Sequence, residues 1–324
     1  MSKPATGRRR LLWIKALVSL GLMAWLGVRM VQRDGVDLLL ERLASMNVGW
    51  LALAVALHFL AVLAGVSRWR SLLDAAELRF GFPRLLRSFL VGRFVGAFTP
   101  STTGLDGWRL YDVGRESGAM ARSATVIVVE KLVGLIGMAT VCAALIPFGG
   151  LDRMGPTAPL VAGAMAGAAM IGLLAMRRPA WLEALVARAP HAKVRSVGAK
   201  LVDALAASRL DGRRALGVVA LGVVSHLALS SVFFATAQAI GVDASPLTLL
   251  VTGNAITLAV LLPVSVGGVG VREGVAVVLL AGVGVASTDA VLVALLGYLT
   301  GQVPALIGGA LTLTGRRAEV PSPA

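Results

Sequence analysis

The feature that most constrains the fold of this sequence is its series of apolar stretches, each about as long as a membrane is thick. Two of them cover residues 11–30 and 215–240. A helix needs about 20 predominantly apolar residues to cross the hydrocarbon core of a bilayer. Water-soluble domains have no need of so many runs of this length. The pattern therefore predicts an all-α polytopic membrane protein.

We expect about six full spans, near residues 11–31, 48–66, 123–148, 158–176, 215–240 and 290–313. Two further apolar regions are shorter and broken. One covers residues 85–98, and the other consists of two arms, 247–262 and 274–285, around a glycine-rich break. Arms of about 12 to 15 residues are short for full spans. They indicate two re-entrant or broken-helix hairpins.

The positions of the basic residues predict which side of the membrane each loop faces. The chain carries a net charge of +14, and its basic residues cluster at positions 3–10, 68–93, 177–214 and 316–317. These clusters flank the apolar segments, where the positive-inside rule places cytoplasmic loops. We therefore expect both termini in the cytoplasm and no nucleic-acid partner. The single cysteine, Cys142, excludes an intramolecular disulfide.

These boundaries divide the chain into five regions. They are a basic cytoplasmic N-terminus (1–10), a first membrane repeat with extra helices (11–176), a basic amphipathic linker (177–214), a second membrane repeat (215–315) and a cytoplasmic tail (316–324). The linker has a helical apolar face flanked by basic residues, a pattern typical of helices at a membrane surface.

A spaced motif, Pro-x3-Gly-x2-Gly-x-Arg, occurs once in each predicted repeat. Its two copies are Pro100, Gly104, Gly107 and Arg109, and then Pro263, Gly267, Gly270 and Arg272. A serine that could cap the next long helix follows each copy, Ser123 in the first and Ser287 in the second. The predicted topology brings the two hairpins in from opposite sides of the membrane. The chain therefore resembles the inverted repeats of many transporters.

The residue types in this motif suit an anion-binding site. Proline breaks a helix, and glycine permits tight turns and close approach. A helix that restarts after a break directs its unpaired N–H groups and positive dipole end into the gap, where they attract anions. An adjacent arginine adds a planar fork that matches phosphate. The alternative is that the glycines only allow close packing and the arginines extend to the interface; the duplication favours a site.

Several neighbours complete the candidate substrate-binding set. Asp106 is close enough in sequence to pair with Arg109, and Glu273 can interact with the N-terminus of its own helix. Glu130 lies deep in a span and needs a cationic partner, for which Arg109 and Arg272 are the candidates. Tyr298 and Gln302 are four residues apart and share a helix face. The candidate set is Asp106, Arg109, Glu130, Arg272, Glu273, Tyr298 and four glycines, Gly104, Gly107, Gly267 and Gly270.

At these residues the chain resembles the lysylphosphatidylglycerol synthase transmembrane, or flippase-like, family. The run of residues 262–274, Leu-Pro-Val-Ser-Val-Gly-Gly-Val-Gly-Val-Arg-Glu-Gly, is similar to the signature of that family's second half. Residues 98–109 and the later Val-Glu-Lys at 129–131 are similar to its first-half pattern. Lys131 replaces the usual arginine, and Asp106-Gly107 replaces the usual Gly-Glu. The resemblance covers roughly residues 10–315.

The resemblance implies movement of a lipid between the leaflets of the bacterial inner membrane, with a membrane phospholipid or a polyprenyl or hopanoid lipid as the partner. We expect Arg109 and Arg272 to hold an anionic headgroup while Glu130 balances charge. Two alternatives remain open. One is a membrane component of a glycosyl- or headgroup-transferase system, with Asp106, Glu130 or Glu273 as base. The other is a scaffold for a separately encoded lipid-modifying enzyme. Since none of the common hydrolase, P-loop or metalloprotease motifs occurs, we expect no enzyme activity, cofactor or metal.

Overall fold

The computed structural model describes residues 40–99, 103–145, 210–261 and 268–313, with isolated residues between 21 and 37 and between 163 and 203. Within these ranges the chain is helical and contains no strand, which confirms the all-α class. The predicted spans at 11–31 and 158–176 and most of the linker lie outside the described residues. The same is true of both terminal segments.

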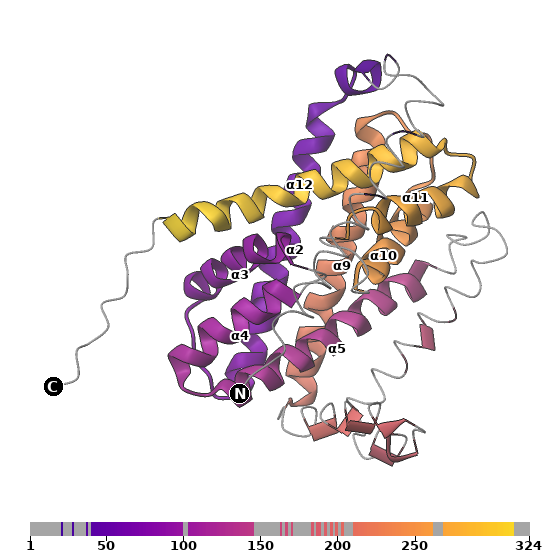
Figure 1. Ribbon diagram of the computed structural model, residues 1–324. Helices are drawn as coiled ribbons and strands as arrows, with labels where there is room; N and C mark the ends of the chain where they lie inside the picture. Colours follow the sequence, from indigo (N-terminus) through magenta and orange to yellow (C-terminus); the bar gives the residue numbers. More distant parts are fainter. Residues whose placement is uncertain are drawn as a thin grey trace.

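Eight helices with defined bounds organise the described part of the chain (Figure 1). They are α2 Val48–Ala75, α3 Phe82–Ala97, α4 Thr103–Ser117, α5 Met120–Leu145, α9 Gly212–Ala239, α10 Pro246–Leu261, α11 Val271–Ala281 and α12 Ser287–Leu313. Four of these, α2, α5, α9 and α12, are long and apolar enough to cross a membrane. They correspond to four of the six predicted spans. The chain is therefore a multi-pass membrane protein.

The end of α2 and the start of α5 differ from the prediction, and tertiary contacts explain the end of α2. α2 was expected to end near residue 66 but continues to Ala75. It continues through Arg68 because that side chain is buried against Glu130 of α5 and not solvated in a loop. The prediction that Ser123 caps the next helix is wrong, because α5 already begins at Met120 and Ser123 is buried inside it.

The two broken regions form helix pairs. α3 packs on α4, and α10 packs on α11. α3 and α10 have 16 residues each and α11 has 11. At 1.5 Å per residue these helices measure about 24 Å and about 16 Å, less than the roughly 30 Å core of a bilayer. Each pair is followed by a long helix, α5 or α12, that packs on its second member.

The two long helices α2 and α9 lie side by side and run in opposite directions (Figure 1). The N–H of Asn47, at the start of α2, donates to the carbonyl of Ala239, at the end of α9, over 2.9 Å. Halfway along, the Ser225 hydroxyl donates to the carbonyl of Ala61 over 3.4 Å. An antiparallel pair therefore stands at the centre of the described helices.

The packing pattern stays the same when α2, α3, α4 and α5 are exchanged for α9, α10, α11 and α12. Thus α5 packs on α9 and α12 packs on α2, while α3 packs on α12 and α10 packs on α5. Two apolar cores follow this division. One gathers around α2, α3 and α5, with Trp69 and Val133 fully buried, and the other around α10, α11 and α12, with Ile256 and Leu280 fully buried.

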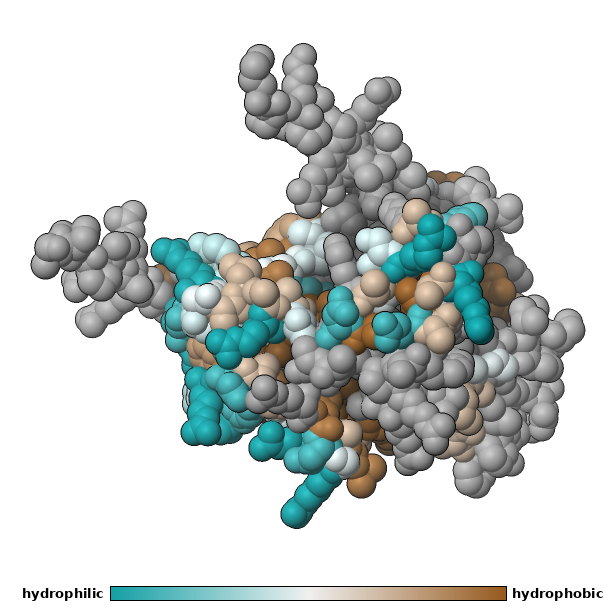
Figure 2. All heavy atoms as spheres, turned by 90° about the horizontal axis from the view of Figure 1, so that it is seen from below, coloured by the Kyte–Doolittle hydropathy of each residue, from teal (hydrophilic) through white to brown (hydrophobic). Residues whose placement is uncertain are grey.

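Polar residues mark one end of the central pair. The last turns of α2 contain the ion pair Arg70–Asp74, and the start of α9 contains Asp211–Arg214. Viewed from below, this end of the molecule shows hydrophilic side chains among hydrophobic ones (Figure 2). Such a mixture suits the boundary between membrane and water.

Candidate functional site

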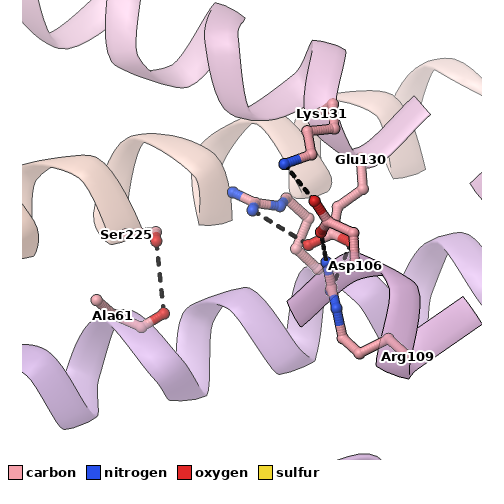
Figure 3. Close-up of polar contacts among 7 residues, drawn as sticks. Ala61, Asp106, Arg109, Glu130, Lys131 and Ser225 are labelled. Carbon is pink, nitrogen blue, oxygen red and sulfur yellow. Dashed lines mark hydrogen bonds and ion pairs between the residues drawn. The ribbon is translucent and has the colours of Figure 1, made fainter. Parts of the chain in front are cut away.

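The arginine of the first motif lies inside a cluster of charges between α4 and α5 (Figure 3). Arg109 is 3% exposed. Its Nη1 donates to Glu130 Oε2 over 2.7 Å, and its Nη2 donates to Asp106 Oδ1 over 2.7 Å. Both carboxylates therefore engage the same guanidinium group, through charge-assisted hydrogen bonds.

Two more cations complete this group, which we call the first-hairpin ion cluster: Arg68, Asp106, Arg109, Glu130 and Lys131. Arg68 Nη2, from α2, donates to Glu130 Oε1 over 3.3 Å, and Lys131 Nζ pairs with Asp106 Oδ2. The Arg109 guanidinium also lies 4.9 Å from the ring centres of both Trp69 and Phe89. The cluster therefore ties α4 to α2, α3 and α5.

The predicted pairing of Asp106 with Arg109 is confirmed, as is the pairing of Glu130 with Arg109. The second cation at Glu130 is Arg68 and not Arg272. We assigned Arg68 to a basic loop because it follows the predicted end of a span. The signal for its burial was the adjacent Trp69, which continues the apolar face of α2 and is 1% exposed.

The second break has a different arrangement. Gly270, with a φ of 83°, precedes the first residue of α11. The Glu273 carboxylate turns back and accepts a hydrogen bond from the Gly270 N–H over 2.6 Å, which confirms the predicted interaction with its own helix N-terminus. Arg272, 6% exposed, places its guanidinium 4.2 Å from the centre of the Tyr298 ring.

Arg272 and Tyr298 line a cavity of about 270 Å³ between the two halves. Its wall is mainly apolar and comes from α2, α3, α4, α9, α10, α11 and α12. The polar side chains in that wall are His58, Arg93, Thr257, Arg272, Tyr298 and Gln302. Two arginines thus face this cavity, and no carboxylate is among the described residues that line it.

One face of α12 gathers most of these polar groups. The Nε2 atom of His58 hydrogen-bonds to the carbonyl of Gly297 over 3.0 Å, and Arg93 Nη2 donates to the carbonyl of Gly301 over 3.1 Å. Tyr298 and Gln302 share this face, as their four-residue spacing predicted, and both line the cavity.

The structure separates the predicted site residues into two groups. Arg272 and Tyr298 line the cavity, whereas Asp106, Arg109 and Glu130 do not and belong to the first-hairpin ion cluster. Gly104 and Gly107 lie inside α4 and not in a break between helices, which differs from the prediction. Gly270 is the N-cap of α11, and Gly267 lies outside the described residues. Substrate binding by these residues stays a prediction.

Sequence reasoning missed three polar residues of the cavity wall, His58, Arg93 and Thr257. Arg93 has no counterpart in the duplicated motif, and His58 stands alone in an apolar span, so neither formed a pattern. The position of Arg93 was the signal available in the sequence, because this residue interrupts a short apolar region seven residues before Pro100. A charged residue within an apolar membrane segment is a candidate functional group.

Of the two described glycines of the first motif, Gly104 is closely packed against α3 and Gly107 is not. A Cβ on Gly104 would overlap the Thr99 side chain and lie 2.9 Å from Gly96 Cα, whereas a Cβ on Gly107 would meet nothing within 4 Å. Gly104→Ala should destabilise the protein by about 1–3 kcal/mol through overpacking of α4 on α3. Gly107→Ala should be neutral or stabilise it by up to about 1 kcal/mol, as in other helix interiors.

Thermal unfolding of the purified variants in one detergent would compare the two substitutions directly. Equal melting temperatures for both would contradict the close approach of α3 and α4 at Gly104.

No curated protein matches the chain. A family model described as the lysylphosphatidylglycerol synthase TM region matches residues 12–309. That match spans all eight of the helices described above except the last residues of α12. It confirms the resemblance that the glycine-arginine motifs predicted. The chain belongs to the family of the lysylphosphatidylglycerol synthase transmembrane region.

Proposed function

We propose that this protein moves a lipid with an anionic headgroup between the leaflets of the bacterial inner membrane, with both of its termini in the cytoplasm. The observation that carries the proposal is the cavity between the two hairpins. Arg93 of α3 and Arg272 of α11 line it, without a carboxylate among its described lining residues. A guanidinium group in a mainly apolar wall offers several N–H donors that match the oxygens of a phosphate or carboxylate headgroup. The family match to a lipid-related membrane region supports the same function.

The packing pattern supports an inverted repeat. The exchange of the first four helices for the last four preserves every helix contact described above, which is the pattern that two halves related by a pseudo-twofold axis would give. The equivalent helices α2 and α9 run antiparallel, as an axis in the membrane plane would require. Repeats related in this way can open a central site to each side in turn. The short helix pairs α3–α4 and α10–α11 then act as re-entrant hairpins whose tips meet at the site.

The size of the cavity indicates which part of the lipid it can hold. About 270 Å³ lies just below the roughly 300 Å³ at which pockets for whole drug-sized ligands begin. A headgroup fits in such a space, while acyl or prenyl chains remain in the surrounding bilayer. The first-hairpin ion cluster has a supporting role in this mechanism. Its ion pairs hold α4 against α2 and α5 and so position one wall of the cavity.

The contacts that the candidate bases make favour transport over the transferase alternative. Asp106 and Glu130 are held in ion pairs, and Glu273 accepts a backbone N–H. None of the three lines the cavity. A general base must reach the proton that it abstracts. A separately encoded lipid-modifying enzyme is then a partner that supplies or consumes the transported lipid.

A leaflet-exchange assay tests the proposal. Proteoliposomes would contain fluorescent phosphatidylglycerol or a fluorescent polyprenyl phosphate, and an impermeant quencher would report the fraction in the outer leaflet. Thr257→Phe fills the cavity from α10 without a change in charge, whereas Val278→Phe adds the same ring at a position that is 72% exposed. We expect exchange with wild type and Val278→Phe, and at least a tenfold slower rate with Thr257→Phe.

Exchange that is no faster than in protein-free vesicles, for both lipids and with folded protein, would contradict transport. Equal rates for Thr257→Phe and Val278→Phe would place the lipid path outside this cavity.

A further inference from the structure

The two cavity arginines come from different halves of the protein but contact the same face of α12. Arg93 donates to the carbonyl of Gly301, and Arg272 lies over the ring of Tyr298. Residues three apart on a helix are neighbours on one face and are separated by about 4.5 Å along the axis. Two guanidinium groups that approach one helix turn from opposite hairpins repel each other unless an anion lies between them.

Arg93 makes few contacts that offset its charge. It is partly buried, and among the residues that the structure describes it has no carboxylate within ion-pair distance. Its Nε is buried without a hydrogen-bond partner, and its Nη2 meets only a backbone carbonyl. A buried guanidinium donor without an acceptor is unfavourable. Arg93 is therefore available to a ligand.

The charge around the cavity limits the class of ligand. Arg93 and Arg272 contribute two positive charges. The neighbouring Glu273 carboxylate is engaged with the N–H of Gly270 at the positive end of α11, which offsets part of its negative charge. The net positive charge that faces a ligand is thus between +1 and +2. A phosphate monoester carries about −1.5 to −2 at pH 7 and has three free acceptor oxygens, whereas a phosphodiester carries one negative charge.

We propose that Arg93 is a second headgroup-binding residue and that it selects a terminal phosphate, as a monoester or the end of a diphosphate, over a phosphodiester. One free oxygen would accept from Arg93 and another from Arg272, so that the phosphate bridges the two hairpins. This inference rests on the proposed headgroup site. It adds the class of headgroup and assigns a role to a residue outside the duplicated motif.

Binding of fluorescent phosphatidic acid and phosphatidylglycerol with identical acyl chains tests the inference on the purified full chain. We expect wild type to bind phosphatidic acid at least tenfold more tightly. Arg93→Gln should remove most of that preference, Arg93→Lys should keep part of it, and Arg87→Gln, an exposed position on the same helix, should leave it unchanged. Because Arg93 has no carboxylate partner in the described residues, its loss should not lower the melting temperature.

Competition separates the two sources of a terminal phosphate. Displacement of phosphatidic acid by millimolar inorganic phosphate would support the same site with a free anion as its ligand, and no displacement would support a lipid ligand. A preference for phosphatidic acid that survives in Arg93→Gln would overturn the inference, as would its absence in wild type. Neither result contradicts the proposed headgroup site, provided that Thr257→Phe still weakens binding of both lipids.

Discussion

Arg272→Gln is expected to weaken lipid binding strongly and to slow leaflet exchange while leaving the fold intact. The guanidinium lies in the wall of the cavity, over the ring of Tyr298, and no other described residue of the second half brings a charge to that wall. Loss of one partner of a buried, hydrogen-bonded charge pair costs about 2–5 kcal/mol of binding energy. At 1.4 kcal/mol per tenfold, this corresponds to an affinity lower by a factor of about 30 or more. Titration of the fluorescent lipid into purified protein would measure it.

Arg272→Lys gives an informative intermediate. A lysine keeps the charge but loses the planar group that stacks on Tyr298 and the fork that matches phosphate oxygens. We expect it to bind more weakly than wild type and more tightly than Arg272→Gln. The matched control is Arg87→Gln, since Arg87 is exposed and, within the described residues, donates to the carbonyl of Leu311. If Arg272→Gln binds lipid as well as this control does, the cavity is not the headgroup site.

Glu130→Gln is expected to destabilise the protein strongly. Its carboxylate receives Arg68 on one oxygen and Arg109 on the other, and it is 4% exposed. A neutral amide would leave two buried guanidinium groups with one carboxylate, Asp106, which Lys131 also contacts. Removal of one partner from a buried ion pair costs about 3–5 kcal/mol. At roughly 2 °C per kcal/mol for a chain of this size, the melting temperature should fall by about 6 °C or more.

A control and a compensating variant separate charge from packing at this position. Glu116 also pairs with an arginine, Arg84, but its side chain is 50% exposed. Glu116→Gln should therefore change stability by no more than about 1 kcal/mol. Arg68→Gln combined with Glu130→Gln should recover part of the loss, because it removes one of the uncompensated cations. Scanning calorimetry or a thiol-independent thermal-shift measurement would compare all three; equal stability of the Glu130 and Glu116 variants would contradict the buried cluster.

Much of the architecture could be predicted from local pattern. Four of the predicted spans correspond to α2, α5, α9 and α12, because about 20 apolar residues in succession have few other stable conformations. Arg272 was correctly placed at the start of a helix after a glycine turn, whereas Arg109 lies in the interior of α4. The match to the family was recognisable from the same motifs. The end of α2 and the start of α5 were missed, because a buried partner for Arg68 and the packing around Ser123 are not local properties.

The sequence by itself determined the class of protein and the four long spans α2, α5, α9 and α12, since these follow from hydrophobic length. Only the tertiary structure decided what each arginine does. Arg109 and Arg272 occupy the same place in the duplicated motif, yet Arg109 meets two carboxylates while Arg272 lines a cavity. Arg93, outside the motif, joins Arg272 there. The reason is physical: the role of a buried charge depends on which opposite charges lie within a few ångströms, and those partners come from distant segments of the chain.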